Sequence, residues 1–309
     1  MPASLRELRQ RRNSVASTQK ITRAMELIAA SRIIKADRAA RAALPYTSLL
    51  NRAVATVAQS GTVDHPLTTE VENPRRAAVV LFTSDRGLAG AYSANAIKMS
   101  LELTERLRRQ GCEVVPYVVG NKGIGYLRFR KIELAGQWHG ISDAPKYEDA
   151  GEIADTLIRA FLTDVEDGGV DEIYCVYTRM RSMLIQEPRV RRVLPIEVVE
   201  EGGSPVNSAQ IDQQQGRELQ FDFEPDAETV LDTLLSLYVR NRIWFYLLES
   251  AASQWASQQR AMKSATDNAQ QLIERLTRQA NQARQAEITQ EISEIVGGAG
   301  ALADMAKEE

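Results

Sequence analysis

Two glycine-containing segments have the residue types and spacing that come closest to doing chemistry: residues 84–90 (SDRGLAG) and residues 120–125 (GNKGIG). Each lies near the end of an apolar run typical of a strand, where backbone N–H groups can approach a phosphate. Neither segment matches GxGxxG or GxxxxGK[ST], the spacings of the two common nucleotide-binding loops. We therefore expect no catalytic residue and no nucleotide cofactor in this chain.

The residues that could hold a metal ion are few and scattered. His65 and His139 are the only histidines, and both lie in segments rich in turn-forming residues. Cys112 and Cys175 each lie in an apolar run, with no Cys or His at metal-ligand spacing. We expect no metal site and two buried, reduced thiols, which suits a reducing, cytoplasmic setting.

Charge is unevenly distributed along the chain. Residues 1–41 hold ten Arg or Lys and three acidic residues, a charge of +7, although the whole chain carries −3. A basic helix of this kind can bind nucleic acid. However, residues 1–41 contain no aromatic side chain and also carry a helical core pattern. We expect no nucleic-acid partner, and infer instead that protein partners offer acidic contact surfaces.

The overall composition excludes a chain that spans a bilayer by itself. The 309 residues are 44% hydrophobic and 6% aromatic, which favours long helices and one compact domain over an all-β core. No run approaches the roughly 20 consecutive apolar residues of a membrane span. The start, MPASLRELRQRRNS, lacks the apolar core of a secretory signal. Any membrane association is expected to be through partners.

The first element that must position these residues is a long helix. Residues 4–58 contain no glycine, and apolar residues recur at steps of three and four. We assign this apolar edge to Ile21, Met25 and Ile28, and further along to Leu44, Leu49 and Leu50. Pro45 lacks an amide hydrogen, so it is expected to bend or interrupt the helix.

The middle of the chain alternates between strand and helix patterns. Expected strands at 76–84, 112–120, 171–179 and 189–199 are separated by a loop leading into a helix at 85–111 and by helical patterns at 121–129 and 147–163. This alternation is typical of a Rossmann-like α/β sheet covered by crossover helices. Residues 202–215 are polar and rich in Gly, Ser and Gln, and they are interpreted as a loop.

A second long helix follows. After Pro225 and Asp226, about 70 residues lack Gly and Pro up to Gly297, and a heptad pattern places Trp255, Met262, Ala269, Leu276 and Ala283 at one seam position. Two long helices that flank one domain can bury both seams by pairing as an antiparallel coiled coil. The fold class we predict is therefore α/β, with a long antiparallel coiled coil.

The two helices differ in expected length. At 1.5 Å per residue they measure about 80 Å and about 105 Å, so the second extends roughly 25 Å, or about 16 residues, beyond the first. This end contains Ile288, Ile292, Ile295 and Val296 on one edge. Because no residue of the first helix can reach these four, we predict that they contact another protein.

Four segments resemble the gamma subunit of F-type ATP synthases: TQKITRAMELIAASR (18–32), TSDRGLAGAYSAN (83–95), AMKSATDNAQQLIERL (261–276) and RQAEITQEISEIVGGAGAL (284–302). The resemblance covers essentially the whole chain. It implies three parts: an N-terminal coiled-coil helix at 1–59, an α/β foot domain at 75–222, and a C-terminal coiled-coil helix and tip at 225–302.

The resemblance implies a rotor shaft that couples proton-driven rotation of a membrane ring to ATP synthesis or hydrolysis at catalytic beta subunits. The chain itself would be non-catalytic. The implied partners are a hexameric ring of alpha and beta subunits, the epsilon subunit and the c-ring, with one copy of this chain in each complex. The implied location is peripheral, on the cytoplasmic face of the cell membrane.

The resemblance also implies roles for individual residues. Arg23 and Met25 would lie where the shaft meets an acidic segment of a beta subunit. Arg284, Gln285, Thr289 and Glu291 would face the beta subunits nearer the end of the long helix. The four apolar residues Ile288, Ile292, Ile295 and Val296 would form a bearing tip inside an apolar sleeve at the top of the ring.

Overall fold

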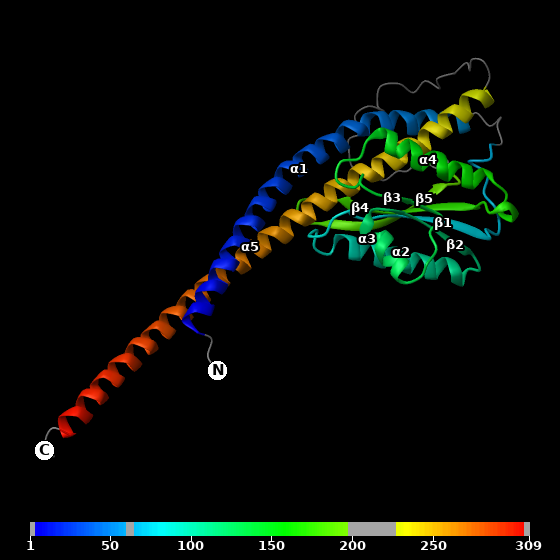
Figure 1. The fold of residues 1–309 in the computed structure, drawn as a ribbon. Helices are drawn as coiled ribbons and strands as arrows, with labels where there is room; N and C mark the ends of the chain where they lie inside the picture. Colours follow the sequence, from blue (N-terminus) through cyan, green and yellow to red (C-terminus); the bar gives the residue numbers. More distant parts are fainter. Residues whose placement is uncertain (1–3, 60–64, 197–226, 306–309) are drawn as a thin grey trace. The chain divides into compact units, whose positions relative to one another are not determined.

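The computed structural model describes residues 4–59, 65–196 and 227–305. The chain divides into two compact units: unit 1 comprises Met1–Ala29 and Gln259–Glu309, and unit 2 comprises Ala30–Gln258. Two long helices, α1 (Leu5–Gln59) and α5 (Ala227–Met305), contribute to both units (Figure 1). Both predicted helices are thus confirmed. The predicted loop at 202–215 lies outside the described residues.

The expected interruption at Pro45 is wrong and the alternative, a local bend, stays a prediction, because α1 runs from Leu5 to Gln59 through Pro45. Its ring lies on the exposed side of the helix, where it displaces no packed neighbour. The Thr47 hydroxyl donates to the Ala43 carbonyl at 2.9 Å, so this turn gains a side-chain bond close to the donor that Pro45 lacks.

Unit 2 is built around a five-stranded sheet with the order β3-β2-β1-β4-β5. Strands β1, β2, β3 and β4 are parallel, and β5 runs antiparallel to β4. The strands are β1 (Arg76–Phe82), β2 (Glu113–Val119), β3 (Gly136–Trp138), β4 (Glu172–Met180) and β5 (Gln186–Leu194). The predicted α/β sheet is confirmed, but β3 was not expected because three residues are too few to show a pattern.

Helices cover both faces of the sheet (Figure 1). Ala77, Val79 and Leu81 of β1 pack with α2 (Tyr92–Arg109) and α3 (Asn121–Phe129). The alternate residues of β1 pack on the other face, with α4 (Tyr147–Leu162) and the unit 2 part of α5. A short 3-10 helix, η1 (Val165–Asp167), follows α4. Burial on both faces explains why β1 has a continuous apolar sequence instead of an alternating one.

Both cysteines are buried and free, as the sequence predicted. Cys175 lies in β4 within the core shared with α4 and α5, whereas Cys112 lies just before β2 in the core shared with α2 and α3. Burial raises the pKa of the Cys112 thiol to about 11, and it raises the pKa of Cys175 further in the same direction. Neither thiol is therefore prepared to act as a nucleophile.

Candidate partner-binding surfaces

In unit 1, α1 and α5 pair antiparallel. Leu8 packs against Leu276 and Ala280, with Leu5 and Ala283 at the edge of the same cluster. Further along α1, Thr22 meets Thr266, so rising numbers in α1 correspond to falling numbers in α5. The α5 seam residues predicted from the heptad pattern within this unit are buried or half-buried, which confirms that assignment.

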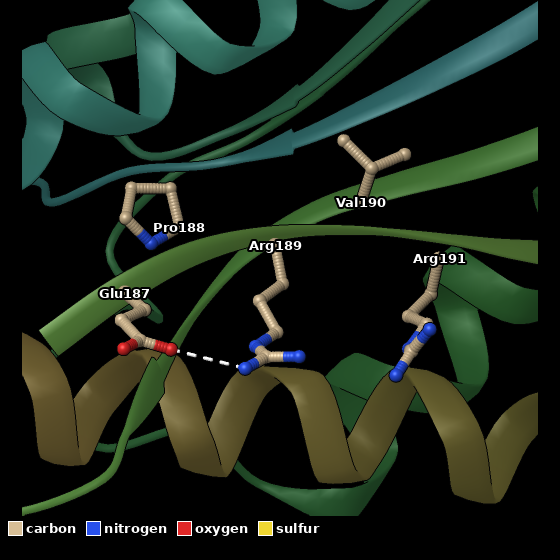
Figure 2. A pocket seen from close by; sticks show the side chains of 5 residues that line it. All are labelled: Glu187, Pro188, Arg189, Val190 and Arg191. Carbon is tan, nitrogen blue, oxygen red and sulfur yellow. Dashed lines mark hydrogen bonds and ion pairs between the residues drawn. The ribbon is translucent and has the colours of Figure 1, made fainter.

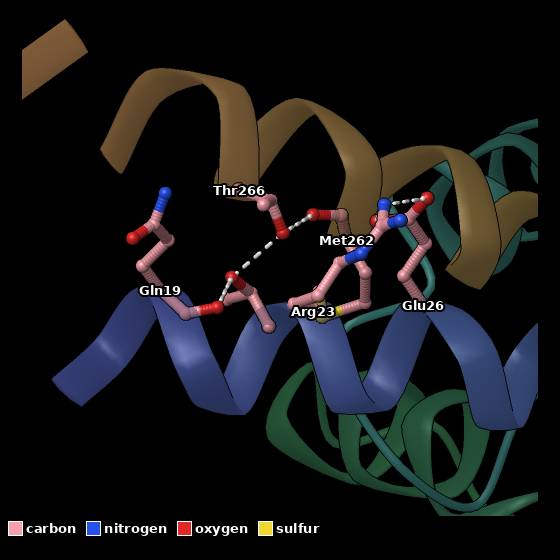
Figure 3. Close-up of polar contacts among 6 residues, drawn as sticks. Gln19, Arg23, Glu26, Met262 and Thr266 are labelled. Atoms are coloured by element: carbon pink, nitrogen blue, oxygen red, sulfur yellow. Dashed lines mark hydrogen bonds and ion pairs between the residues drawn. The ribbon is translucent and has the colours of Figure 1, made fainter. Parts of the chain in front are cut away.

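Two polar contacts cross the seam of unit 1. The Gln19 amide donates to Gln270 Oε1 at 2.8 Å, and the Thr22 and Thr266 hydroxyl oxygens lie 2.8 Å apart. Figure 3 shows that each threonine hydroxyl also reaches a carbonyl in its own helix, those of Gln19 and Met262. Directional bonds at a coiled-coil seam fix the register of the two helices.

An ion pair lies beside these contacts on α1. Arg23 Nη1 binds both carboxylate oxygens of Glu26, at 3.0 and 2.9 Å (Figure 3). Glu26 is buried, whereas more than half of the Arg23 side chain is exposed. Arg23 therefore neutralises a carboxylate that faces the seam while its guanidinium still reaches the surface. Met25, the neighbouring residue that the resemblance singles out, is half-buried.

The apolar edge assigned to α1 from the sequence faces outward, which is a correction. Ile21 and Ile28 are more than half exposed, as is Leu27 beside them. Leu44 and Leu49 in the unit 2 part of α1 are also exposed, whereas Leu50 is buried. The inward positions of α1 in unit 1 instead repeat every seven residues at Leu8, Val15, Thr22 and Ala29. The sequence criterion was the recurrence of apolar residues at steps of three and four, which misses seam positions such as Thr22 that are not apolar.

At the end of α5, the described side chains of residues 284–296 have no packed neighbour. Ala283 is the last α5 residue that packs against α1 among those with described side chains, and residues 284–296 are all exposed. Ile292 is 56% and Ile295 is 71% exposed, and Ile288 and Val296 are also exposed. Helix α5 continues to Met305. The unpaired end was predicted, but it begins earlier than the expected final 16 residues because the seam stops at Ala283.

The predicted partner-contact residues share one side of this unpaired end. Arg284, Gln285, Thr289 and Glu291 are exposed, and at about 100° per residue they fall in the same arc of roughly 160° as the four apolar tip residues. The opposite side carries Glu287, Gln290 and Glu294, of which the last two are hydrogen-bonded at 3.0 Å. The end of α5 thus has two different faces. One carries the apolar tip residues together with the predicted partner-contact residues, and the other is acidic.

The glycine segments that could have bound a phosphate are filled by the chain itself. Gly120 has a φ of +96°, and a Cβ there would lie 2.2 Å from the Thr83 carbonyl oxygen. Asp85 accepts from the backbone N–H groups of Asn121 and Ser142 at 3.1 and 3.0 Å. Burial alone would raise the pKa of Asp85, but hydrogen bonds from Gly140, Ser142 and Asn121 hold it below the usual value. These residues close the loop instead of leaving donors free for a ligand.

A pocket of about 430 Å³ follows the edge strand β5. Figure 2 shows Glu187, Arg189 and Arg191 on the side of β5 that faces α5, and Pro188 and Val190 on the other side. Glu187 binds Arg189 at 3.0 Å and Arg181 at 3.1 Å, and these hydrogen bonds lower its pKa. The pocket is lined by one carboxylate and two guanidinium groups, and none of its lining residues carries a nucleophilic hydroxyl or thiol. Such charges on an edge strand oppose pairing with other chains.

The described residues contain no group of three or more His, Cys, Asp or Glu side chains that could hold a metal ion. They also contain no helix that is long and apolar enough to cross a membrane.

The fold is that of central-stalk chains of ATP synthases. One solved chain comes from a structure described as the Euglena gracilis mitochondrial ATP synthase OSCP/F1/c-ring. It aligns with a TM-score of 0.64 and 14% identity over 96% of this chain and 94% of that one. A chain of the Tetrahymena thermophila central stalk and c-ring structure aligns with a TM-score of 0.56 and 19% identity, over 79% of this chain and 99% of that one.

Sequence comparison gives the family. The ATP synthase family matches residues 4–302. The ATP synthase gamma chain of Thermobifida fusca is 57% identical over 303 residues, 98% of each chain, and that of Cutibacterium acnes is 54% identical over the full length of both. The chain belongs to the family of ATP synthase gamma chains.

Proposed function

We propose that the chain is the central rotor shaft of an F-type ATP synthase, which couples proton-driven rotation of a membrane ring to ATP synthesis or hydrolysis. Catalysis takes place in the beta subunits and not in this chain. The observation that carries the proposal is the unpaired end of α5, whose exposed isoleucines and valine lie on one face of a helix beyond the last seam residue, Ala283. The outward apolar residues of α1 add a second uncovered surface in the same unit.

Exposed apolar surface of this kind marks a protein interface. The occupant we propose is a ring of three alpha and three beta subunits around unit 1. Ile288, Ile292, Ile295 and Val296 fit an apolar sleeve, because non-directional contacts resist rotation less than hydrogen bonds do. Arg23 and Met25 on α1 would contact acidic segments of the beta subunits. Arg284, Gln285, Thr289 and Glu291 would contact the beta subunits near the tip.

The physical requirement for coupling is asymmetry. Each tenfold change in nucleotide affinity at a beta subunit requires about 1.4 kcal/mol of differential contact with the shaft. A pair of helices supplies such a difference, since the apolar outer face of α1 and the two-sided end of α5 present different chemistry in different directions. Unit 2 would bind the epsilon subunit and the c-ring. One copy per complex and a peripheral location on the cytoplasmic side of the cell membrane complete the proposal.

The test compares the two faces of the unpaired end. The chain is co-expressed with the alpha and beta subunits of a close relative, such as those of Thermobifida fusca. In one variant Ile288, Ile292 and Ile295 become Ala; in the matched control Glu287, Gln290 and Glu294 become Ala. We expect the first set to lower the affinity of the chain for the ring by about tenfold or more, because several apolar side chains lose burial.

The control set is expected to assemble normally, with both variants retaining wild-type helicity by circular dichroism. Equal assembly of the two variants would contradict the sleeve contact. Failure of the unaltered chain to enter any complex with alpha and beta subunits would contradict the rotor function as a whole. Steady-state ATP turnover by the purified chain alone would contradict its non-catalytic role.

A further inference from the structure

One segment of α5 inside unit 2 differs from the rest of the helix because every side of it is enclosed. All eight residues from 250 to 257 are buried, whereas a helix on a domain surface normally exposes one side. Most of the enclosed residues are small: Ser250, Ala251, Ala252, Ser253, Ala256 and Ser257. A helix with such small side chains presents a smooth surface, so steric interlocking alone gives little resistance to turning about its axis.

Hydrogen bonds supply the resistance to turning about the helix axis that the small side chains do not give. Two residues of α5 bind β4. Glu249 Oε2 accepts from the Met180 N–H at 3.1 Å, and the Ser253 hydroxyl donates to the Thr178 carbonyl at 2.9 Å. At the far end, the Ser257 hydroxyl donates to Gln186 Oε1 at 3.2 Å. These three bonds attach the enclosed segment to β4 and to the start of β5.

The two long side chains of the segment both bind Asp143, which lies in the loop before α4. Gln254 Nε2 donates to the carboxylate at 2.5 Å, and the Trp255 indole N–H donates to the backbone carbonyl at 2.9 Å. Gln254 is only 2% exposed, so its amide bond is shielded from water. We call these five bonds the polar collar; its members on α5 are Glu249, Ser253, Gln254, Trp255 and Ser257.

Asp143 is itself held by the body of unit 2. Arg86 Nε lies 3.4 Å from the Asp143 carboxylate. The preceding residue, Ser142, is bound to Asp85 twice: the Asp85 N–H donates to its hydroxyl at 2.8 Å, and its own N–H donates to the Asp85 carboxylate at 3.0 Å. Asp85 also binds the first residue of α3. The collar therefore connects α5 to β4, to β5 and to the loop after β1.

We propose that the polar collar is the junction through which torque passes between the α/β domain and α5, and that Asp143 is its main positioning residue on the domain side. This inference rests on the proposed rotor function. A hydrogen bond opposes displacement of its donor from its acceptor, whereas apolar contacts between small residues lose little when one surface slides over another. Five bonds on different sides of α5 oppose rotation of the helix within the domain in either direction.

The test removes the two bonds to Asp143 and keeps the bulk of both side chains. Gln254→Met replaces the amide, whose Oε1 has no hydrogen-bond partner among the described residues, so no buried donor or acceptor is left on residue 254. Trp255→Phe removes the indole N–H. The matched control is Gln258→Met, the same exchange at a half-buried position one turn further along, which takes no part in the collar.

Two readouts separate torque transmission from simple stability. A probe on the α/β domain of the alpha–beta–gamma complex is expected to show angular fluctuations with a variance about 1.7-fold that of the control, because three of five comparable bonds remain. ATP-driven proton pumping in vesicles with the whole enzyme is expected to fall by about twofold. ATP hydrolysis by the complex without its membrane ring is expected to stay at the control level, since no load then acts on the domain.

Unchanged fluctuations and pumping in the double variant would overturn the collar proposal while leaving the rotor function intact. Failure of the unaltered chain to form a rotating complex would instead overturn the rotor function. If the double variant unfolds, Trp255→Phe alone serves as the second variant. It removes one bond and should show the same direction of change with a smaller amplitude, and wild-type stiffness in that variant would also contradict the proposal.

Discussion

Two segments of helix α5 differ in how far the rest of the chain covers and binds them. Residues 250–257 are enclosed and, together with the half-buried Glu249, bound by five directional hydrogen bonds, whereas residues 284–296 are exposed and have no contact with α1. The first segment is rich in small and polar residues, while the apolar side chains of the second point outward. One helix can therefore be fixed at one place and free of its own chain at another, with the local side chains deciding which.

The largest expected contrast comes from truncating one side chain in each segment. Trp255→Ala should lower the free energy of unfolding by about 3–5 kcal/mol, because it removes a large buried side chain. Ile292→Ala should change it by less than about 0.5 kcal/mol, since the isoleucine is already mostly exposed. Chemical denaturation of the isolated chain measures both. Comparable losses would mean that the end of α5 is covered by its own chain.

A smaller effect on the free energy of unfolding is expected for Asp85, which binds Ser142 next to Asp143. In Asp85→Asn only one side-chain oxygen remains, so either the Asn121 or the Ser142 N–H faces an NH₂ group instead of an acceptor. We expect a loss of about 1–2 kcal/mol at pH 7, at the low end of values for bonds to charged groups because the site is partly solvated.

The same variant has a pH signature. The folded pKa of Asp85 is lowered, so its contribution is present above the unfolded pKa of about 3.9 and is lost as the pH falls through the folded value. The difference in unfolding free energy between wild type and Asp85→Asn should therefore shrink below about pH 4. A difference that is constant from pH 7 to pH 3 would show that the charge of Asp85 has no role.

The smallest effect is expected at Glu249 in the collar. Burial raises the pKa of this carboxyl, although the Met180 N–H opposes the shift. A raised folded pKa means that the ionised form costs stability above that pKa, and the cost disappears as the pH falls toward the unfolded value of about 4.3. Glu249→Gln keeps an acceptor for Met180, so it should stabilise the chain at pH 7 by about 1 kcal/mol or less.

The pH profile provides the control for this variant. The advantage of Glu249→Gln should shrink as the pH falls below the raised folded pKa of Glu249 and vanish below the unfolded value of about 4.3, where the carboxyl is protonated in both states. Thermal unfolding at several pH values measures it. A variant that is destabilised at pH 7 would show that the negative charge strengthens the collar, contrary to the cost expected from burial.

The α/β fold, both long helices and the unpaired end could be predicted from the sequence, because each depends on local periodicity or on helix length. The inward face of α1 could not, since its seam in unit 1 uses Gln19, Thr22 and Glu26 while Ile21 and Ile28 face outward. A hydrophobicity pattern marks a face that favours burial, and it does not show whether the same chain covers that face.

The collar was missed for a different reason. Gln254 and Trp255 meet Asp143, which lies more than a hundred residues earlier in a turn-rich loop, so no local pattern connects them. The signal that was available is the run ESAASQWASQ at 249–258, where several small residues surround Gln254 and Trp255. The domain boundaries inferred from resemblance, at 1–59, 75–222 and 225–302, remain predictions.

The burial of both cysteines has a practical consequence for measuring rotation and angular fluctuations of the chain with attached probes. Thiol-selective labels react with the thiolate, and the raised pKa values of Cys112 and Cys175 leave almost none of it at neutral pH, in sites that reagents cannot enter. A cysteine introduced on an exposed helix face, for example at Gln290, would then be the reactive one. Fluorophores or spin labels can be attached there without first removing the native sulfur atoms.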